Sequence, residues 1–259
     1  MAMPTKRDVT MRRILLLLML LLPLCMVAQT RKQGVQPRKR TIVKVQKEVT
    51  IPADTLDHEV LFQTTKGDIK LLLYKETPRH KNNFMKLVRE GFFDGTLFHR
   101  VIANFMIQGG DSTTRHARPG EPAGLFSPDY TIPAEILYPK FFHKRGALAA
   151  AREGDADNPE RASSASQFYI VYGDTYTDAQ LDHVQEKLDV STQGKVKLTP
   201  AVRDYYRLHG GTPHLDGQYT VFGEVEEGLD VVRDIDSVKT DAASRPLEDV
   251  RIIKATLIR

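Results

Sequence analysis

The sequence predicts a mainly-β domain, built as a barrel or a sandwich, that starts near residue 58 and carries an inserted pair of helices. Three observations support this fold class. Short runs of alternating hydrophobic residues recur from residue 60 onward, only two helical patterns lie among them, and residues 174–212 interrupt them with further helical patterns. Hydrophobic residues make up 41% of the chain, which is enough for a sizeable core.

The first predicted elements are a β-hairpin and a helix. Residues 60–65 and 68–74 are separated by a Lys-Gly turn, and alternating hydrophobic side chains in the second run are typical of a strand. Thr77 followed by Pro78 predicts a helix N-cap with proline at the first helical position. An apolar stripe with helical spacing continues this helix until Gly91.

The rest of the domain follows from the same two periodicities. We expect six more strands and one more short helix, without any internal repeat. The strands are residues 97–101, 105–108, 147–151, 167–172 and 219–225; the helix is residues 229–235, and a closing strand covers residues 250–257.

Residues 174–212 form the predicted insertion. Thr177 and Gln180 make a capping-box pattern ahead of one apolar stripe, and Thr199 precedes a second helix that ends at Gly210. Because each helix has a single apolar stripe, we expect the pair to pack on the barrel as an α-hairpin.

The N-terminal residues 1–29 have the pattern of a secretory signal peptide. Four basic residues precede residues 14–22, which are wholly Ile, Leu and Met, and small residues follow at the end. A membrane span would need about 20 apolar residues, so an uncleaved anchor is the alternative interpretation. Met11 is an alternative start, because two arginines follow it directly.

The only cysteine, Cys25, lies at the end of this segment. It opens a second alternative, a lipoprotein anchored through that thiol, although Leu24 is bulky where such processing usually requires a small residue. Cleavage after Ala28 would leave a mature protein without cysteine or disulfides. We therefore expect an exported protein, in the periplasm, with anchoring through lipidated Cys25 or an uncleaved signal segment as alternatives.

Residues 30–57 are predicted to be a basic linker, and residues 58–259 the folded domain. Eleven of the 37 basic residues but only two of the 33 acidic residues precede position 51, so the remainder carries a net charge of about −5. A basic tail can contact anionic lipid or nucleic acid. We interpret it as a solvated tether and expect no nucleic-acid partner, with membrane contact at most peripheral or through a lipid.

The most informative stretch is FHRVIANFMIQGGD, residues 98–111. It brings one permanent cation, Arg100, close in sequence to Phe105, Met106 and Gln108. These residue types suit a small hydrophobic pocket with one strong hydrogen-bond donor. Taken singly, however, an arginine in a strand most often forms an ion pair, and a double glycine marks only a turn.

Other kinds of site find no support in the sequence. No histidine has the i, i+4 partner or the nearby cysteines that a zinc site needs, so we assign no metal and expect no cofactor. The chain has no Gly-x-Ser-x-Gly elbow, phosphate-binding loop or nucleotide fingerprint. His99 is interpreted as a structural neighbour of Arg100 rather than as a base.

Taken together, residues 98–111 and several further segments resemble the cyclophilins, the β-barrel peptidyl-prolyl cis-trans isomerases. The resemblance covers roughly residues 60–259 in the family's order and is interrupted by the insertion. It implies a closed eight-stranded antiparallel β-barrel capped by two α-helices. The further segments are TKGDI (65–69), the helix 78–91, GFFDGTLFHR (91–100), GALAAAR (146–152), SQFYI (166–170) and LDGQYTVFG (215–223).

The resemblance also implies site residues. Arg100 matches the catalytic arginine, Gln108 the glutamine that hydrogen-bonds to the substrate backbone, and Ala151 with Arg152 the strand that holds the peptide extended. Tyr169 stands where the family usually has phenylalanine. Together with Tyr169, the pocket walls are matched by Phe105, Met106 and Leu215.

Two positions depart from many eukaryotic members. His214 replaces a tryptophan, which puts cyclosporin affinity in doubt more than catalysis. Tyr219 replaces a histidine, a change that is familiar among bacterial members.

The expected function is therefore peptidyl-prolyl isomerisation during the folding of exported proteins, by a monomer that binds proline-containing polypeptides. The alternative is a chaperone or scaffold that holds proline-containing segments with little turnover. The insertion keeps this alternative open, because it enters the chain just before His214 and Leu215.

Overall fold

The computed structural model describes residues 56–259. The predicted signal peptide and the predicted linker up to residue 55 lie outside the described residues, so both interpretations stay predictions. Within the described part of the chain, no helix combines the length and the apolar character needed to cross a membrane.

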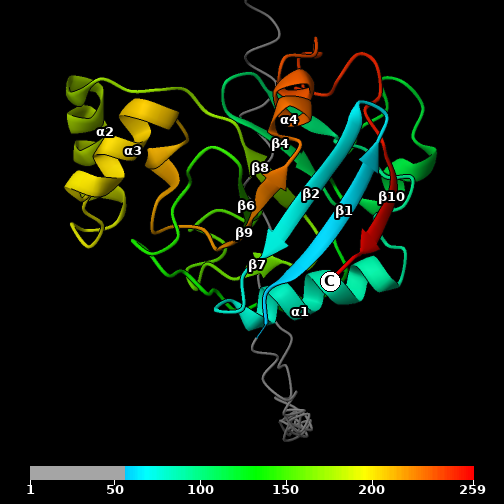
Figure 1. Cartoon of the computed structure of the whole chain (residues 1–259), viewed down its shortest axis with the longest axis horizontal. Coiled ribbons are helices and arrows are strands. Elements are labelled where there is room, and N and C mark those ends of the chain that lie inside the picture. The colour runs from blue at the N-terminus through cyan, green and yellow to red at the C-terminus, as the bar shows by residue number, and fades with distance from the viewer. Residues whose placement is uncertain (1–55) are drawn as a thin grey trace, which may run out of the picture. The chain divides into compact units, whose positions relative to one another are not determined.

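Residues 56–259 contain ten strands, four α-helices and two 3-10 helices (Figure 1). The strands are β1 (His58–Thr64), β2 (Gly67–Leu73), β3 (Arg100–Ile102), β4 (Met106–Gly109), β5 (Thr131–Ile132), β6 (Ala147–Ala150), β7 (Ser163–Ser164), β8 (Phe168–Val171), β9 (Val221–Glu227) and β10 (Ile252–Leu257). The helices are α1 (Pro78–Arg89), η1 (Ser112–His116), α2 (Asp178–Ser191), α3 (Pro200–His209), η2 (Pro213–Leu215) and α4 (Leu229–Asp236).

Eight strands form one antiparallel sheet in the order β10-β1-β2-β9-β6-β8-β4-β3, and β5 pairs with β7. The predicted hairpin is confirmed, since β1 and β2 pair along their whole length from His58–Leu73 to Thr64–Gly67. Figure 1 shows α1 and α4 at opposite ends of this hairpin, so the two helices close the ends of the curved sheet.

The predicted closed barrel is wrong, because the sheet is an open half-barrel. Its end strands, β3 and β10, do not pair with each other. The segment before β3 meets the start of β10 through an isolated bridge between Leu97 and Arg251 and through backbone hydrogen bonds of Ile252, whose carbonyl accepts from the Gly95 amide and whose amide donates to the Thr96 carbonyl, at 2.7 and 2.8 Å. At β3 itself, the Val101 amide donates at 2.8 Å to the carbonyl of Ser244, a residue of the loop before β10. A loop therefore occupies the position that a closing strand pair would need.

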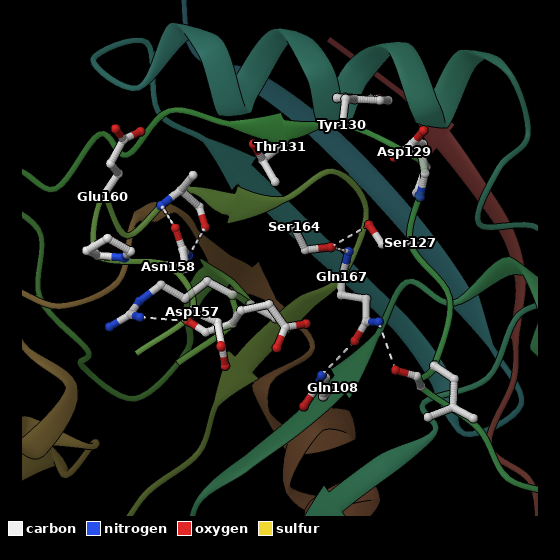
Figure 2. A pocket seen from close by; sticks show the side chains of 18 residues that line it. Gln108, Ser127, Asp129, Tyr130, Thr131, Asp157, Asn158, Glu160, Ser164 and Gln167 are labelled. Carbon is white, nitrogen blue, oxygen red and sulfur yellow. Dashed lines mark hydrogen bonds between the residues drawn. The ribbon is translucent and has the colours of Figure 1, made fainter. Parts of the chain in front are cut away.

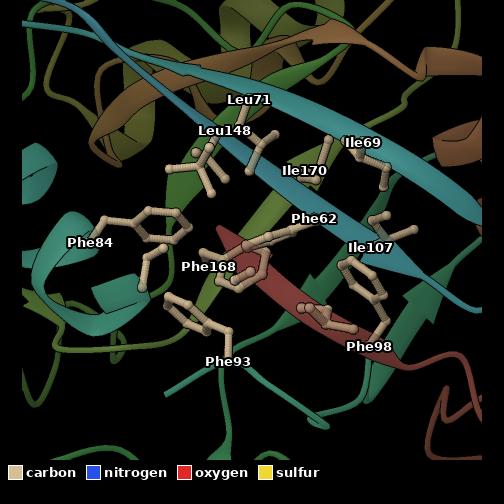
Figure 3. Close-up of a cluster of buried hydrophobic side chains, with 14 of the residues drawn as sticks. Phe62, Ile69, Leu71, Phe84, Phe93, Phe98, Ile107, Leu148, Phe168 and Ile170 are labelled. Atoms are coloured by element: carbon tan, nitrogen blue, oxygen red, sulfur yellow. The ribbon is translucent and has the colours of Figure 1, made fainter. Parts of the chain in front are cut away.

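The main core lies between one face of the sheet and the helices α1 and α4. Phe62 of β1 stands at its centre, with ring centroids 6.0 Å from Phe84, 5.8 Å from Phe93 and 5.6 Å from Phe168 (Figure 3). Aromatic rings in tilted and edge-on contact fill volume and contribute beyond the area that they bury. This core holds the strands that carry the candidate site on their other face.

The start of α1 is held by a residue far away in sequence. Thr77 occupies the N-cap position as predicted, but its hydroxyl does not cap the helix. Instead the Glu135 carboxylate accepts the backbone N–H groups of Arg79 and His80 at 3.1 and 3.0 Å. The His80 ring bridges Glu135 and the Ser163 hydroxyl, at 2.7 and 2.9 Å. Ser163 is only 1% exposed, so this Ser-His-Glu chain serves to anchor α1.

The helices α2 and α3 lie in the stretch where the sequence predicts an α-hairpin (Figure 1). The predicted capping box is confirmed, because Thr177 and Gln180 exchange both hydrogen bonds. Apolar residues of the two helices form a cluster of their own, against which Tyr138 and Phe142 of the barrel pack. The insertion therefore has its own hydrophobic cluster, which contacts the rest of the domain through Tyr138 and Phe142.

Candidate active site

The candidate site lies on the face of the sheet opposite the main core. Because side chains alternate along a strand, Val101 and Ile107 enter the main core. Met106, which lies between Phe105 and Ile107, belongs to a second hydrophobic cluster on the other face. Arg100 pairs in register with Gln108, and both line the same cavity as Met106. One strand pair thus supplies core residues on one side and site residues on the other.

A cavity of about 170 Å³ gathers nine of the ten residues that the sequence singles out. The tenth, His214, stands beside the cavity with its ring stacked on Phe105 at a centroid distance of 5.4 Å. The volume suits one small ring rather than a large side chain. The nine residues are Arg100, Phe105, Met106, Gln108, Ala151, Arg152, Tyr169, Leu215 and Tyr219.

The cavity has two arginines, and their surroundings differ. Arg152 is fixed: its guanidinium makes an ion pair with Asp155 at 2.6 Å, donates to the Gln218 carbonyl at 2.9 Å and stacks over the Tyr219 ring at 4.4 Å. Arg100 is exposed, and it forms no ion pair with any carboxylate of the described residues. Arg100 is therefore the arginine with donors left to offer a ligand.

A relay of amide groups orients Arg100. Its guanidinium donates to the Gln108 side-chain oxygen at 3.1 Å, and the Gln108 amide donates to the Gln167 oxygen at 2.9 Å. Gln167 is held in turn by the carbonyls of Gly124 and Phe126, each at 3.0 Å. The sequence segment SQFYI contains Gln167, but sequence reasoning gave this residue no role.

The other pocket walls are also held in place. The Tyr169 hydroxyl meets a ring nitrogen of His143 at 2.9 Å, and burial raises the pKa of Tyr169 well above its usual value, so the hydroxyl stays protonated. The Ala151 amide donates to the Gln167 carbonyl and its carbonyl accepts from Ser164, at 3.0 and 2.8 Å. Sequence reasoning missed His143, because no local pattern places it beside Tyr169.

The histidines near the site are poor candidates for a base at neutral pH. His99 is buried, and burial lowers its pKa to about 4. Neither of its ring nitrogens has a hydrogen-bond partner among the described residues. Burial also lowers the pKa of His214. Both rings are therefore neutral at pH 7, and the interpretation of His99 as a structural neighbour of Arg100 fits its surroundings.

A second and larger hollow, of about 1060 Å³, adjoins the cavity and shares Gln108, Ala151 and Arg152 with it. Loops around residues 124–131 and 153–164 line it. Figure 2 shows Gln108 and Gln167 hydrogen-bonded at one side of this hollow, with Asp157, Asn158 and Glu160 across it. An extended chain held at the cavity would have room to continue here.

The described residues include no cluster of three or more His, Cys, Asp or Glu side chains that could hold a metal ion.

Comparison with known proteins relates this chain to one family. Residues 59–257 match the family model described as cyclophilin type peptidyl-prolyl cis-trans isomerase. A putative peptidyl-prolyl cis-trans isomerase of Staphylococcus aureus is 35% identical over 198 residues, covering 75% of this chain and 88% of that protein. A putative bifunctional phosphatase/peptidyl-prolyl cis-trans isomerase of Streptococcus pyogenes is 33% identical, and the match spans 80% of this chain but only 41% of that relative.

Solved structures show the same fold. A cyclophilin type peptidyl-prolyl cis-trans isomerase of Cryptosporidium parvum aligns with a TM-score of 0.57 and 22% identity, over 79% of this chain and 99% of its own. A second crystal structure of that protein, determined in the presence of the dipeptide Ala-Pro, aligns with a TM-score of 0.56 over 78% of this chain and 99% of its own.

Proposed function

The chain belongs to the cyclophilin-type peptidyl-prolyl cis-trans isomerases, and we propose that it accelerates rotation about Xaa-Pro bonds with Arg100 as its catalytic residue. The observation that carries this proposal is a guanidinium without a carboxylate partner in the described residues, held by Gln108 at the rim of a small apolar cavity.

The reaction needs no nucleophile, base or metal, because no covalent bond breaks. Rotation about the partial double bond has a barrier of about 18–20 kcal/mol. In the twisted state the amide resonance is lost and the proline nitrogen gains a free lone pair. A directional cation aimed at that nitrogen, or at the proline carbonyl, stabilises the twisted state more than either planar state.

The magnitudes show what the pocket has to add. An acceleration of about 10⁵-fold corresponds to about 7 kcal/mol, whereas one charge-assisted hydrogen bond contributes about 1.5–3 kcal/mol. The remainder has to come from fixing the peptide and from excluding water, which strengthens the field of Arg100. Phe105, Met106, Tyr169 and Leu215 supply the apolar walls for the pyrrolidine ring.

The residues around these walls bind the peptide. Gln108 offers its amide to the substrate backbone while it orients Arg100. Ala151 and Arg152 border both the cavity and the larger hollow, where they would hold an extended chain. Tyr219 and His214 complete the rim, since Tyr219 lies under the Arg152 guanidinium and His214 against Phe105.

The cellular role that we propose is the folding of exported proteins. Its support is the leader-like pattern of residues 1–29, which would send the protein to the periplasm, as a free protein or anchored through Cys25 or the signal segment. Proline-containing polypeptides are the proposed partners of a monomer.

A protease-coupled assay on a short Xaa-Pro peptide tests the proposed activity. Arg100→Ala is expected to lose most of the catalysed rate and to keep the wild-type melting temperature. Arg89→Ala, at an exposed position in the last turn of α1, is the matched control and should keep full activity. Full activity in a folded Arg100→Ala protein would refute the assignment.

A second candidate function is low-turnover binding of proline-containing segments, as a chaperone or scaffold. One observation favours it: the insertion exposes two large apolar side chains, Val190 at 84% and Leu208 at 72%. The double variant Val190→Ser/Leu208→Ser should then slow catalysed refolding of a whole protein while sparing a short peptide. Leu247→Ser, at an exposed leucine outside the insertion, is the control. If the double variant matched the wild-type rate on the whole protein as well as on the peptide, the insertion would have no binding role.

A further inference from the structure

A chain of buried polar groups leads from the pocket wall into the insertion. The Tyr169 hydroxyl meets Nε2 of His143 at 2.9 Å, and Nδ1 of His143 meets the Asp216 carboxylate at 3.0 Å. The other carboxylate oxygen accepts the hydroxyl of Tyr206, a residue of α3, at 2.8 Å. All four residues are 5% exposed or less. A cavity residue is thus connected to an inserted helix through groups that water does not reach.

The directions of these hydrogen bonds follow from the acceptor at the centre. Asp216 can only accept as a carboxylate, and it also receives the His143 backbone N–H at 2.8 Å. Nδ1 of a neutral His143 ring must then carry the proton, which leaves Nε2 to accept from the Tyr169 hydroxyl. Burial raises the pKa of both tyrosines, so both hydroxyls stay protonated donors. Every group in the chain therefore has a partner.

The base of the insertion is fixed to the same segment. The Gly211 amide donates to the Asp174 carbonyl at 3.0 Å, and the Thr212 amide donates to the His143 carbonyl at 2.9 Å. A Cβ on Gly211 would lie 2.4 Å from that carbonyl oxygen and 2.7 Å from the Tyr206 ring. Only glycine allows this approach, so α3 and the segment carrying His143 are held at a short fixed separation.

Asp216 is also next in sequence to a residue of the pocket wall. Asp216 comes after Leu215, whose side chain lines the cavity at the end of η2. Asp216 therefore follows one wall residue in the sequence, and it is hydrogen-bonded through His143 to a second wall residue, Tyr169. The Tyr206 hydroxyl supplies one of the three hydrogen bonds that hold the Asp216 carboxylate, and the only one of them to its Oδ2 atom in the described residues.

We infer that Tyr206, which does not line the cavity, is a positioning residue that sets the proline pocket through Asp216, His143 and Tyr169. This inference rests on the proposed function, and it gives the insertion a part in substrate binding. The Tyr169 ring would contact the pyrrolidine in planar and twisted states alike. A displaced wall should therefore raise KM and leave kcat nearly unchanged.

The test is a double-mutant cycle on the full chain with a short Xaa-Pro peptide. Tyr206→Phe removes one hydroxyl and keeps the packed ring, and we expect it to raise KM about three- to tenfold, the worth of one buried hydrogen bond. In a Tyr169→Phe background the same change should alter KM by less than about twofold, because the series of hydrogen bonds from Tyr206 then no longer reaches the pocket wall.

Tyr205→Phe is the matched control, because it removes a hydroxyl from the neighbouring position of α3 that does not belong to the chain. It should leave KM and kcat at the wild-type values. A Tyr206→Phe effect on KM no larger than that of Tyr205→Phe would overturn the inference. An effect of equal size with and without the Tyr169 hydroxyl would also overturn it, since it would show a merely structural role.

A second measurement is independent of activity. The ¹⁵N NMR shifts of His143 in the wild-type protein are expected to show the proton on Nδ1, and Tyr206→Phe should change them while Tyr205→Phe should not. A proton on Nε2, or shifts unaffected by Tyr206→Phe, would contradict the inference. A wild-type protein without isomerase activity, in contrast, would refute the proposed function. The ¹⁵N shifts would still decide whether the hydrogen bonds from Tyr206 to Tyr169 form as described.

Discussion

The Arg100 guanidinium donates to the side-chain oxygen of Gln108 at 3.1 Å, across a register pair of β3 and β4. A neutral amide can orient a guanidinium without neutralising its charge. A carboxylate at the same position would hold the cation in a charge-assisted pair, for which the substrate would have to compete.

We therefore expect Gln108→Glu to lower kcat/KM by about tenfold or more, since a hydrogen bond between charged groups is worth about 1.5–3 kcal/mol. The measurement is the protease-coupled rate on a short Xaa-Pro peptide. Gln63→Glu adds the same charge at an exposed position of β1 and should leave the rate unchanged. Wild-type activity in Gln108→Glu would show that the unpaired charge of Arg100 is not needed.

The catalysed rate should be nearly flat between about pH 6 and pH 8. Arginine keeps its charge throughout this range. His99, with a pKa of about 4, is neutral across this range, and burial lowers the pKa of His214 from its usual 6.5, which favours the neutral ring. The test is kcat/KM measured at half-unit steps of pH. A steep bell centred near neutrality would implicate a histidine in the chemistry.

Acid should destabilise the fold through His99. Its pKa is about 4 when folded and about 6.5 when unfolded, so between these values the unfolded chain binds a proton that the folded chain lacks. Stability from this group is present above pH 6.5 and is lost as the pH falls toward 4. By pH 4.5 the loss is about 2–3 kcal/mol.

Urea unfolding at pH 7 and pH 4.5 measures this effect. In His99→Gln the difference in unfolding free energy between the two pH values should shrink by about 2–3 kcal/mol relative to wild type. His116→Gln, at an exposed histidine, is the control and should keep the wild-type difference. The same loss in His99→Gln as in wild type would assign the acid sensitivity to other groups.

Gly211→Ala should destabilise the protein more than a left-handed glycine alone explains. Gly211 has φ 142° and no space for a Cβ, whereas Gly194 in the same insertion has φ 72° and nothing within 4 Å of a built Cβ. Gly194→Ala is therefore expected to cost only the backbone strain, about 1–2 kcal/mol. Thermal unfolding should show a clearly larger loss for Gly211→Ala, and equal losses would mean that the neighbouring backbone adapts without cost.

Local patterns predicted much of this fold. The β1–β2 hairpin, the start of α1 at Pro78, and the capping box of Thr177 and Gln180 all depend on residues a few positions apart, and the structure confirms them. The residues that line the cavity could be predicted because strand alternation and the resemblance to a known family select the same side chains.

What the sequence could not predict depends on contacts between distant residues. Closure of the barrel failed because the loop containing Ser244, and not β10, lies beside β3. The true cap of α1, Glu135, is more than 50 residues from the helix start. His143 and Asp216 are 73 positions apart, and no local sequence pattern around either residue predicts their contact.

The gap between β3 and β10 has a consequence for self-association. Exposed strand edges offer N–H and C=O groups on which a second molecule can extend the sheet. Along β10 two of these groups are already engaged, since the Ala255 amide donates to the Asp94 carboxylate and the Ile252 amide to the Thr96 carbonyl, each at 2.8 Å. These contacts leave fewer free groups on the β10 edge for a strand of a second molecule to pair with.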